Sequence, residues 1–411
     1  MSHQELLPHL FRTEYRKIVS VLCKHFGLVH IEIAEDLTSE TFLTASELWG
    51  LKGLPENPTA WLYTVAKNKA KNYLRNDAIF RKHLSTGMNS DRNDIDAQEF
   101  KIDLSAKNIQ DSQLQMLFVI CHPSIPDDAQ VGLALRILCG FGIDEIARAF
   151  LTTKENINKR LFRAKEKLRA GNIMIEIPHA KELTDRLDTV LRTLYLIFNE
   201  GYYSSCQDIT LNKDLCLEAM RLTHLLLENE STNKPAVHAF FSLMCFHASR
   251  FEARVNAVGE PVLYKDQDDS LWDHDLISRG EYHLNLAYTG NSLSRYHLEA
   301  GIAYWHTNKS DLGEKWENIL QLYNQLLILE YSPIAALNRT YALSKANGPA
   351  EAIVEAEKLH LDQNHLYHAL LGELYSTINK VKARTHFEKA FELAISSADK
   401  NIMKKKMDDL A

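Results

Sequence analysis

Residues 143–169, with the sequence IDEIARAFLTTKENINKRLFRAKEKLR, limit the fold of this chain more than any other stretch. A short segment with apolar residues at helical spacing ends near Phe150, and a second such segment begins a few residues later. Thr152 or Thr153 can cap the second segment, and Thr152 has capping-box spacing to Glu155. The pattern predicts two helices joined by a tight turn, which is the layout of a helix-turn-helix.

The second of these segments has one apolar and one basic face. Its apolar residues are Ile157, Leu161, Ala164 and Leu168. Its opposite face carries Asn156, Lys159, Arg160, Arg163, Lys167 and Arg169. In a helix-turn-helix the second helix enters the major groove of DNA, so this face predicts DNA binding. The alternative is an ordinary amphipathic pair with a solvated basic surface, which many all-α proteins contain.

The charge of the chain is distributed unevenly. The whole chain has a net charge of −7, which by itself argues against a nucleic-acid binder. However, residues 1–171 carry +2 and the rest −9, and residues 59–83 and 148–169 form compact basic clusters of +5 and +6. Phosphate contact requires local positive charge, so these clusters matter more than the total.

Several classes of protein are disfavoured by what the sequence lacks. No apolar run approaches eighteen residues, and the N-terminus lacks a signal-peptide layout, so we expect a cytoplasmic protein without a membrane span. The six cysteines form no Cys-x-x-Cys pair and are expected to be reduced core residues. We find no phosphate loop, nucleophile elbow or zinc pattern, and therefore expect neither enzymatic activity nor a cofactor.

Three amphipathic helices are predicted at the N-terminus, at about residues 6–26, 33–49 and 58–76. Asn57 as cap and Pro58 at the first helical position mark the start of the third. Asn68, Asn72 and Arg75 share one face of that helix. Aromatic residues such as Trp61 beside basic and amide side chains can stack unpaired bases. For Trp61 alone, a core position is slightly favoured.

These segments together resemble a known family of proteins. The resemblance rests on AEDLTSETFLTASELW, NPTAWLYTVAKNKAKNYLRN and residues 143–169, which occur in the order and at the separation found in bacterial extracytoplasmic-function (ECF) sigma factors of the sigma-70 family. It implies sigma region 2 at residues 1–83, a flexible linker at 84–110 and sigma region 4 at 111–171. The chain departs from the family at Leu151, where a glycine is usual in the turn.

The family implies partners and residue roles. Sigma factors bind core RNA polymerase, at the β′ clamp helices and the β flap, and promoter DNA. The resemblance assigns the β′ clamp contact to Asp36, Leu37, Thr38 and Phe42. It assigns recognition of the −10 element to Trp61, Asn68, Asn72 and Arg75. It assigns recognition of the −35 element to Asn156, Lys159, Arg160 and Arg163.

Residues 180–411 are predicted to be helical throughout. Their last part repeats with a 34-residue spacing, so that Leu337, Tyr341 and Ile353 correspond to Leu371, Tyr375 and Phe387. This spacing is typical of tetratricopeptide (TPR) arrays, in which stacked helical hairpins bury a shared core. The resemblance extends here to the sigma subgroup with a fused TPR-like extension, and it implies that the extension modulates the sigma region. A protein or peptide partner is expected for the array.

An acidic loop at residues 263–273, LYKDQDDSLWD, stands out within this half. Asp266, Asp268, Asp269 and Asp273 could form a metal or catalytic site, although the oxygen spacing of a calcium loop is broken at Ser270. The ordinary interpretation is a loop in which Asp273 or Ser270 caps the next helix. The loop, with Trp272, also resembles a signature of the same sigma subgroup, as does FNEGYYSS at residues 198–205, and we expect the loop to mediate contact between the two halves.

The sequence therefore predicts an all-α protein with two small sigma domains, the second a helix-turn-helix, followed by a TPR-like hairpin array. The predicted function is promoter-directed initiation of transcription, modulated by the C-terminal array. One alternative is a helix-turn-helix regulator that binds DNA without polymerase and senses a ligand or peptide through the repeats. A second is an enzyme that uses the acidic loop.

Overall fold

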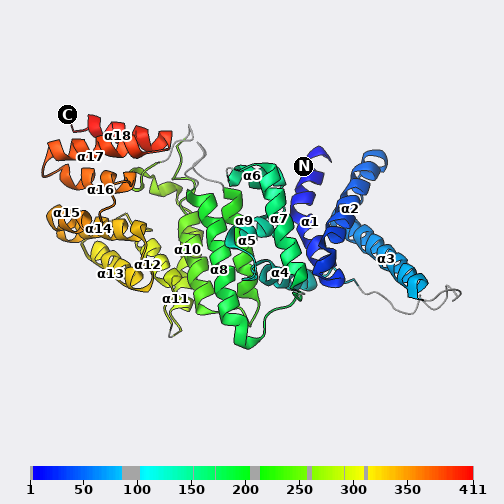
Figure 1. Ribbon diagram of the computed structural model, residues 1–411. Helices are drawn as coiled ribbons and strands as arrows, with labels where there is room; N and C mark the ends of the chain where they lie inside the picture. The colour runs from blue at the N-terminus through cyan, green and yellow to red at the C-terminus, as the bar shows by residue number, and fades with distance from the viewer. Residues whose placement is uncertain are drawn as a thin grey trace. The chain divides into compact units, whose positions relative to one another are not determined.

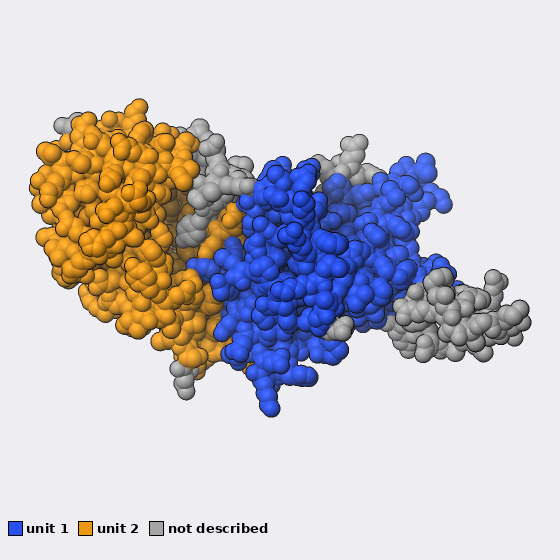
Figure 2. Space-filling model, viewed as in Figure 1, with its two compact units in different colours: residues 1–196 blue, residues 197–411 orange. Residues whose placement is uncertain are grey.

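The computed structural model describes residues 3–85, 102–150, 152–171, 173–203, 213–256, 262–290, 292–309 and 313–410. The regular secondary structure in these ranges is helical, as predicted (Figure 1). The chain divides into two compact units, residues 1–196 and 197–411 (Figure 2). Residues 86–101, which make up most of the predicted linker, and Leu151 in the predicted turn lie outside the described residues.

The first unit contains the predicted sigma segments. Its helices are α1 (His3–Phe26), α2 (Ile31–Lys52), α3 (Pro58–Ser85), α4 (Ala106–Ile120), α5 (Asp127–Leu133), a π-helical turn (Ala134–Leu138), α6 (Ile143–Ala149), α7 (Lys154–Ala170) and α8 (Ala180–Tyr203). Helix α3 starts as predicted, because the Asn57 side chain accepts a hydrogen bond of 3.0 Å from the backbone N–H of Ala60. It continues to Ser85, beyond the expected end near residue 76.

Helix α1 lies at the centre of this unit. It packs against α2 and α3, and also against α4 and the π-helical turn. Ile18, Val19 and Leu22 on α1 are fully buried. Helices from both predicted sigma regions therefore share one core. The domain boundaries predicted at residues 83 and 111 remain predictions.

Helix α8 continues through the division between the units. Thr193 donates a hydrogen bond of 2.8 Å to the side chain of Gln130 in the first unit. Arg186 donates another, of 2.6 Å, to the carbonyl oxygen of Phe118. Phe198 and Tyr202, further along the same helix, are buried in the second unit. The residues of α8 before position 196 are thus part of the fold of the first unit.

The second unit is built from ten further helices in the described part of the chain. They are α9 (Lys213–Glu228), α10 (Pro235–Ala248), α11 (His274–Ala287), α12 (Arg295–Trp305), α13 (Gly313–Leu329), α14 (Pro333–Asn347), α15 (Pro349–Glu357), α16 (His365–Tyr375), α17 (Lys380–Leu393) and α18 (Ser397–Asp408). The most buried of them is α10, which packs against α9, α11 and α12.

Helix α10 ends at Ala248, within a stretch predicted to be helical throughout, and the backbone that follows makes other contacts. The Ser249 hydroxyl donates to the carbonyl oxygen of Phe246 over 2.8 Å. The Ser249 carbonyl oxygen accepts the backbone N–H of Asp273, also over 2.8 Å, instead of continuing the helix.

Helices α12 to α17 form three successive hairpins, which occupy the yellow-to-red part of the ribbon (Figure 1). One continuous apolar core runs through them, from Leu298 to Phe387. The first and third hairpins pack closely at a glycine: a Cβ atom added at Gly372 would lie 2.6 Å from the ring of Phe387, and one at Gly301 would lie 3.2 Å from Leu322. Glycine at these positions lets the two helices of a hairpin approach closely.

Candidate nucleic-acid interface

The predicted helix-turn-helix corresponds to α6 and α7. The side chain of Thr153 accepts a hydrogen bond of 3.2 Å from the backbone N–H of Asn156. Of the two predicted candidates, Thr153 is therefore the N-cap of α7, and Thr152 is not. At α6, the carboxylate of Glu145 accepts the backbone N–H of Gly142 over 2.7 Å. The four apolar residues predicted to face inward from α7 are all buried: Ile157, Leu161, Ala164 and Leu168.

The opposite face of α7 is accessible and basic. Asn156, Lys159 and Arg163 are exposed, while Arg160 is half-buried and pairs with Asp128 on α5 at 3.2 Å. Phe162 lies on the same side with 61% of its surface exposed. An exposed phenylalanine flanked by basic residues can make apolar contact with a thymine methyl group in the major groove. Sequence reasoning missed Phe162, although its position outside the apolar stripe was visible in the helical spacing.

The predicted −10 residues lie on α3. Asn68, Asn72 and Arg75 are all exposed, as expected for positions that share one helical face. Trp61 is half-buried, and its ring packs edge-to-face on that of Trp49 in α2, with 5.3 Å between centroids. Trp61 is thus partly held by the core, which leaves the three polar residues as the accessible part of this set.

Tyr63, two residues after Trp61 on α3, is bound to α1. Its hydroxyl donates to the carboxylate of Glu14 over 2.5 Å. Burial of Tyr63 raises the pKa of its phenol, and the hydrogen bond to Glu14 raises it further. The phenol therefore stays protonated at neutral pH and fixes the start of α3 against α1.

The predicted polymerase-contact residues on α2 divide into two groups. Asp36 is exposed, whereas Leu37, Thr38 and Phe42 are buried. The ring of Phe42 packs against that of Phe11 with centroids 5.0 Å apart. Buried side chains of this kind hold the helix in place and cannot themselves meet a partner in this structure.

The accessible face of α2 contains residues that the sequence analysis passed over. Leu43 and Leu51 are 59% and 83% exposed, and the acidic side chains of Glu40 and Glu47 lie beside them. Exposed leucines among carboxylates are typical of a surface that binds another protein. The signal was present in the sequence, since positions 36, 40, 43, 47 and 51 follow the helical period.

Two basic residues at the end of α7 face inward, toward α2. Lys165 donates to the carboxylate of Glu35 over 2.6 Å, and the side chains of this pair are only 13% and 14% exposed. Arg169 pairs with Glu32, and Arg136 lies 3.7 Å from Glu35. These ion pairs join α7 to the start of α2. Part of the positive charge counted in residues 148–169 is therefore neutralised within the unit.

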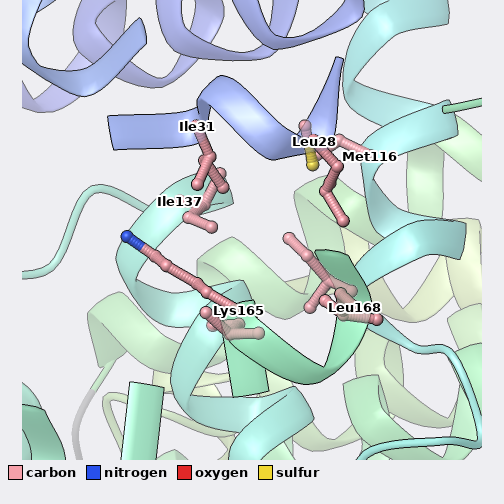
Figure 3. A pocket seen from close by; sticks show the side chains of 8 residues that line it. Leu28, Ile31, Met116, Ile137, Lys165 and Leu168 are labelled. Carbon is pink, nitrogen blue, oxygen red and sulfur yellow. The ribbon is translucent and has the colours of Figure 1, made fainter. Parts of the chain in front are cut away.

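Apolar side chains beneath the Lys165–Glu35 pair enclose a small cavity. Leu28, Ile31, Met116, Ile137 and Leu168 line it together with the stem of Lys165 (Figure 3). Its volume is about 10 Å³, which is barely enough for one water molecule. It is a packing gap between α4, α7 and the start of α2 and has no room for a ligand.

The cysteines of the described ranges are free and buried, as predicted for reduced core residues: Cys23, Cys121, Cys139, Cys216 and Cys245. Burial raises the pKa of the Cys121 thiol to about 12, which keeps it protonated. No group of three or more potential metal ligands comes together in the parts of the chain that the structure describes. Within the same ranges, no helix has the length and apolarity needed to cross a membrane.

The acidic loop of the second unit contains capping residues. Asp273 accepts the backbone N–H of Leu276 over 2.9 Å and caps α11, as predicted. Asp268 accepts both the hydroxyl and the backbone N–H of Ser270, which lower the pKa of its carboxyl. Asp266 and Asp269 are exposed, and Trp272 is buried. The proposed role of this loop in contact between the halves remains a prediction.

Comparison with known proteins agrees with the geometry of the first unit. Residues 10–78, which span α1, α2 and most of α3, match sigma-70 region 2. The ECF RNA polymerase sigma-E factors of Escherichia coli (strain K12) and Salmonella typhimurium are each 32% identical over 113 residues, which are 26% of this chain and 56% of theirs. The chain thus matches about half the length of these relatives. These matches show that the first unit contains a sigma-70 region 2 segment and is similar over part of its length to ECF sigma factors.

The chain has a relative along almost its whole length. An uncharacterized protein of Rhizobium meliloti (strain 1021) is 33% identical over 391 residues, covering 93% of this chain and 91% of that protein. The chain belongs to the same family as this protein. Residues 186–288 also match a family of unknown function, DUF6596. No solved structure was found to match.

Proposed function

We propose that the chain is a sigma factor that binds core RNA polymerase and directs it to specific promoters. The main support is the combination of a region 2 match on α1–α3 with a downstream helix-turn-helix whose exposed face is basic. In this proposal Asn68, Asn72 and Arg75 on α3 hold the melted −10 strand. The −35 duplex is contacted by α7, through Asn156, Lys159, Arg160 and Arg163. The protein acts by binding, without bond chemistry of its own.

The size of the DNA-reading surface limits what the isolated chain can do. A good bidentate contact favours the correct base over a wrong one by about 1–3 kcal/mol, so a few such contacts give only a loose preference for one DNA sequence. Ion pairs within the first unit further reduce the positive charge available to phosphate. We therefore expect weak promoter binding by the chain alone, and polymerase must supply most of the affinity.

The outer face of α2 is our proposed docking surface for the clamp helices of the β′ subunit. Asp36, Glu40 and Glu47 supply negative charge, and Leu43 and Leu51 supply accessible apolar surface. Leu37, Thr38 and Phe42, which the family resemblance also assigned to this contact, would support the surface from beneath. A docking test should change the exposed residues, because substitution of Phe42 would damage the core.

We further propose that residues 197–411 modulate the sigma region as a TPR-like array. The support is the run of helical hairpins with a shared core and the separation of charge, +2 for residues 1–171 against −9 for the rest. An acidic surface can compete with DNA or polymerase for basic residues. The hairpin grooves would accept a protein or peptide partner.

The deciding experiment is transcription in vitro with purified core polymerase and the full chain. The expected result is co-purification with core and new start sites on genomic fragments, with little binding to the same fragments by the chain alone. An Asp36→Asn/Leu43→Ser double variant should lose the complex with core, whereas Ser46→Ala, elsewhere on α2, should retain it. Tight DNA binding without any association with core would instead favour the polymerase-independent regulator.

A further inference from the structure

A cleft of about 620 Å³ opens in the second unit, beside the acidic loop. Residues of the loop, α11, the end of α12 with the segment after it, and the start of α13 line it. The volume lies in the range of about 300–1,000 Å³ that is typical of small-molecule sites. None of the functions considered so far uses this cleft.

The walls of the cleft are fixed by hydrogen bonds between the loop and the segment after α12. The Tyr264 hydroxyl lies 3.1 Å from the carbonyl oxygens of both His306 and Asn308. Lys309 donates to the carbonyl oxygen of Gln267. Asp273 caps α11 at the other end of the loop. A cleft whose walls are held in this way loses little free energy to ordering when a ligand binds.

Three aromatic side chains line the cleft: Trp272 from the loop, and Tyr304 and Trp305 from the end of α12. Trp272 is only 5% exposed, and its indole N–H has no hydrogen-bond partner among the described residues. An unsatisfied buried donor costs about 1–3 kcal/mol. The indole nitrogen has almost no accessible surface, so Trp272 belongs to the wall of the cleft and does not present its N–H to a ligand there.

The charged groups of the cleft differ in how far they are already engaged. Lys309 is bound by the Gln267 carbonyl oxygen, and Lys315 donates to the Asn308 carbonyl oxygen over 2.5 Å. Three lining carboxylates, by contrast, have no hydrogen-bond or ion-pair partner within the described ranges: Asp269, Glu281 and Glu314. Because the partners of Lys309 and Lys315 are neutral carbonyl oxygens, both ammonium groups keep their charge, and the three carboxylates exceed them by one. Aromatic faces attract cations with about 0.5–2 kcal/mol each and add to that excess of negative charge.

We propose that this cleft binds a small organic cation, an alkylammonium or guanidinium group on a flat apolar body. The carboxylates meet the positive charge, and Tyr304 and Trp305 cover the apolar body. The proposal is independent of the sigma function and holds whether or not the chain binds polymerase.

The test uses three probes that share one benzamide and differ in the charge of the chain end. They are N-(4-aminobutyl)benzamide, which is cationic, N-pentylbenzamide, which is neutral, and 5-benzamidopentanoate, which is anionic. Each is titrated into the full chain by calorimetry and by tryptophan fluorescence. At about 0.3 kcal/mol per heavy atom, the cation should bind saturably with a Kd of about 1 mM, and the other two at least about fivefold more weakly.

Two variants locate the binding. Glu281 is exposed, so Glu281→Gln should leave the fold intact. It should weaken the binding of the cationic probe by about two- to fivefold and leave the binding of the other two probes unchanged. Trp272→Phe replaces the indole in the cleft wall by a smaller ring, and the lost apolar contact should weaken the binding of all three probes by about two- to tenfold. Glu392→Gln, an exposed carboxylate on α17 outside the cleft, is the control and should change nothing.

Some outcomes would overturn the proposal. They are the absence of saturable binding by the cationic probe, equal binding of the anionic probe, or a Glu281→Gln variant that binds the cation as well as the original chain does. If Trp272→Phe does not fold, the comparison of probe charges and the Glu281→Gln result still decide the matter.

Discussion

Single residues on α7 have two different functions in this protein. Lys165 and Arg169 neutralise carboxylates of α2, whereas Lys159 and Arg163 point away from the core. Counting charge along the sequence cannot separate these two groups, because both fall in the same basic cluster. Lys159 and Arg163 are available to phosphate whereas Lys165 and Arg169 are not, and this difference leads to separate predictions for the two groups.

We predict that Arg163→Ala and Lys159→Ala, singly and together, weaken promoter use while leaving the fold unchanged, because both side chains are exposed. Each lost phosphate contact should reduce the log–log salt slope of DNA binding by about 0.9. The measurement is binding of the polymerase complex to promoter DNA across a salt series. An unchanged slope and unchanged promoter use in the double variant would contradict the assignment of α7 to DNA.

We predict that Glu35→Gln destabilises the first unit by about 1–3 kcal/mol, because it leaves the nearly buried ammonium of Lys165 without its charged partner. Urea unfolding followed by circular dichroism measures the change. The matched control is Glu40→Gln, which breaks the exposed pair with Lys69 and should cost no more than about 1 kcal/mol. If both variants lose the same free energy of unfolding, the Glu35–Lys165 pair contributes no more to stability than an exposed ion pair does.

At the scale of elements, close helix packing holds the hairpins of the second unit together. Gly372 on α16 faces the ring of Phe387 on α17, and no larger residue fits without movement. The preceding hairpin fills the equivalent positions differently, with Asn338 and Ile353 in place of Gly372 and Phe387. The 34-residue spacing was visible because apolar positions such as Leu337 and Leu371 recur and are buried in one core.

We predict that Gly372→Ala destabilises the second unit by about 1–3 kcal/mol through overpacking against Phe387. The control is Gly50→Ala on α2, where an added Cβ atom meets nothing within 4 Å and alanine favours the helix by about 0.5–1 kcal/mol. Thermal unfolding of both variants provides the comparison. A neutral Gly372→Ala variant would mean that α16 and α17 can move apart at little cost.

At the scale of the whole molecule, the proposed modulation can be tested only with a truncation that respects α8. A chain ending at residue 171 would lose Arg186 and Thr193, which hydrogen-bond within the first unit. Residues 1–203 retain the whole of α8. This fragment is therefore the better comparison with the full chain.

We predict that residues 1–203 initiate transcription more strongly than the full chain at low salt, and that the difference shrinks as salt screens the acidic second unit. Transcription in vitro at several salt concentrations measures both chains. Equal activity at every concentration would rule out electrostatic competition, and loss of activity on truncation would show that the second unit is needed for initiation.

The sequence determined the helices, because amphipathic period, caps and turn residues act over a few neighbours. It predicted the Asn57 cap, the buried stripe of α7 and the hairpin repeat, and it placed Asn68, Asn72 and Arg75 on one accessible face. The family resemblance added the expected partners. All of these features depend on residues that lie close together along the chain.

Tertiary structure alone decided which of these residues remain accessible. Burial of Phe42, pairing of Lys165 with Glu35 and the end of α10 at Ala248 depend on residues far away in the sequence. The cleft around Trp272 likewise exists only because the acidic loop is hydrogen-bonded to the segment after α12. Local pattern fixes what a helix is made of, whereas long-range packing fixes which of its side chains can meet a partner.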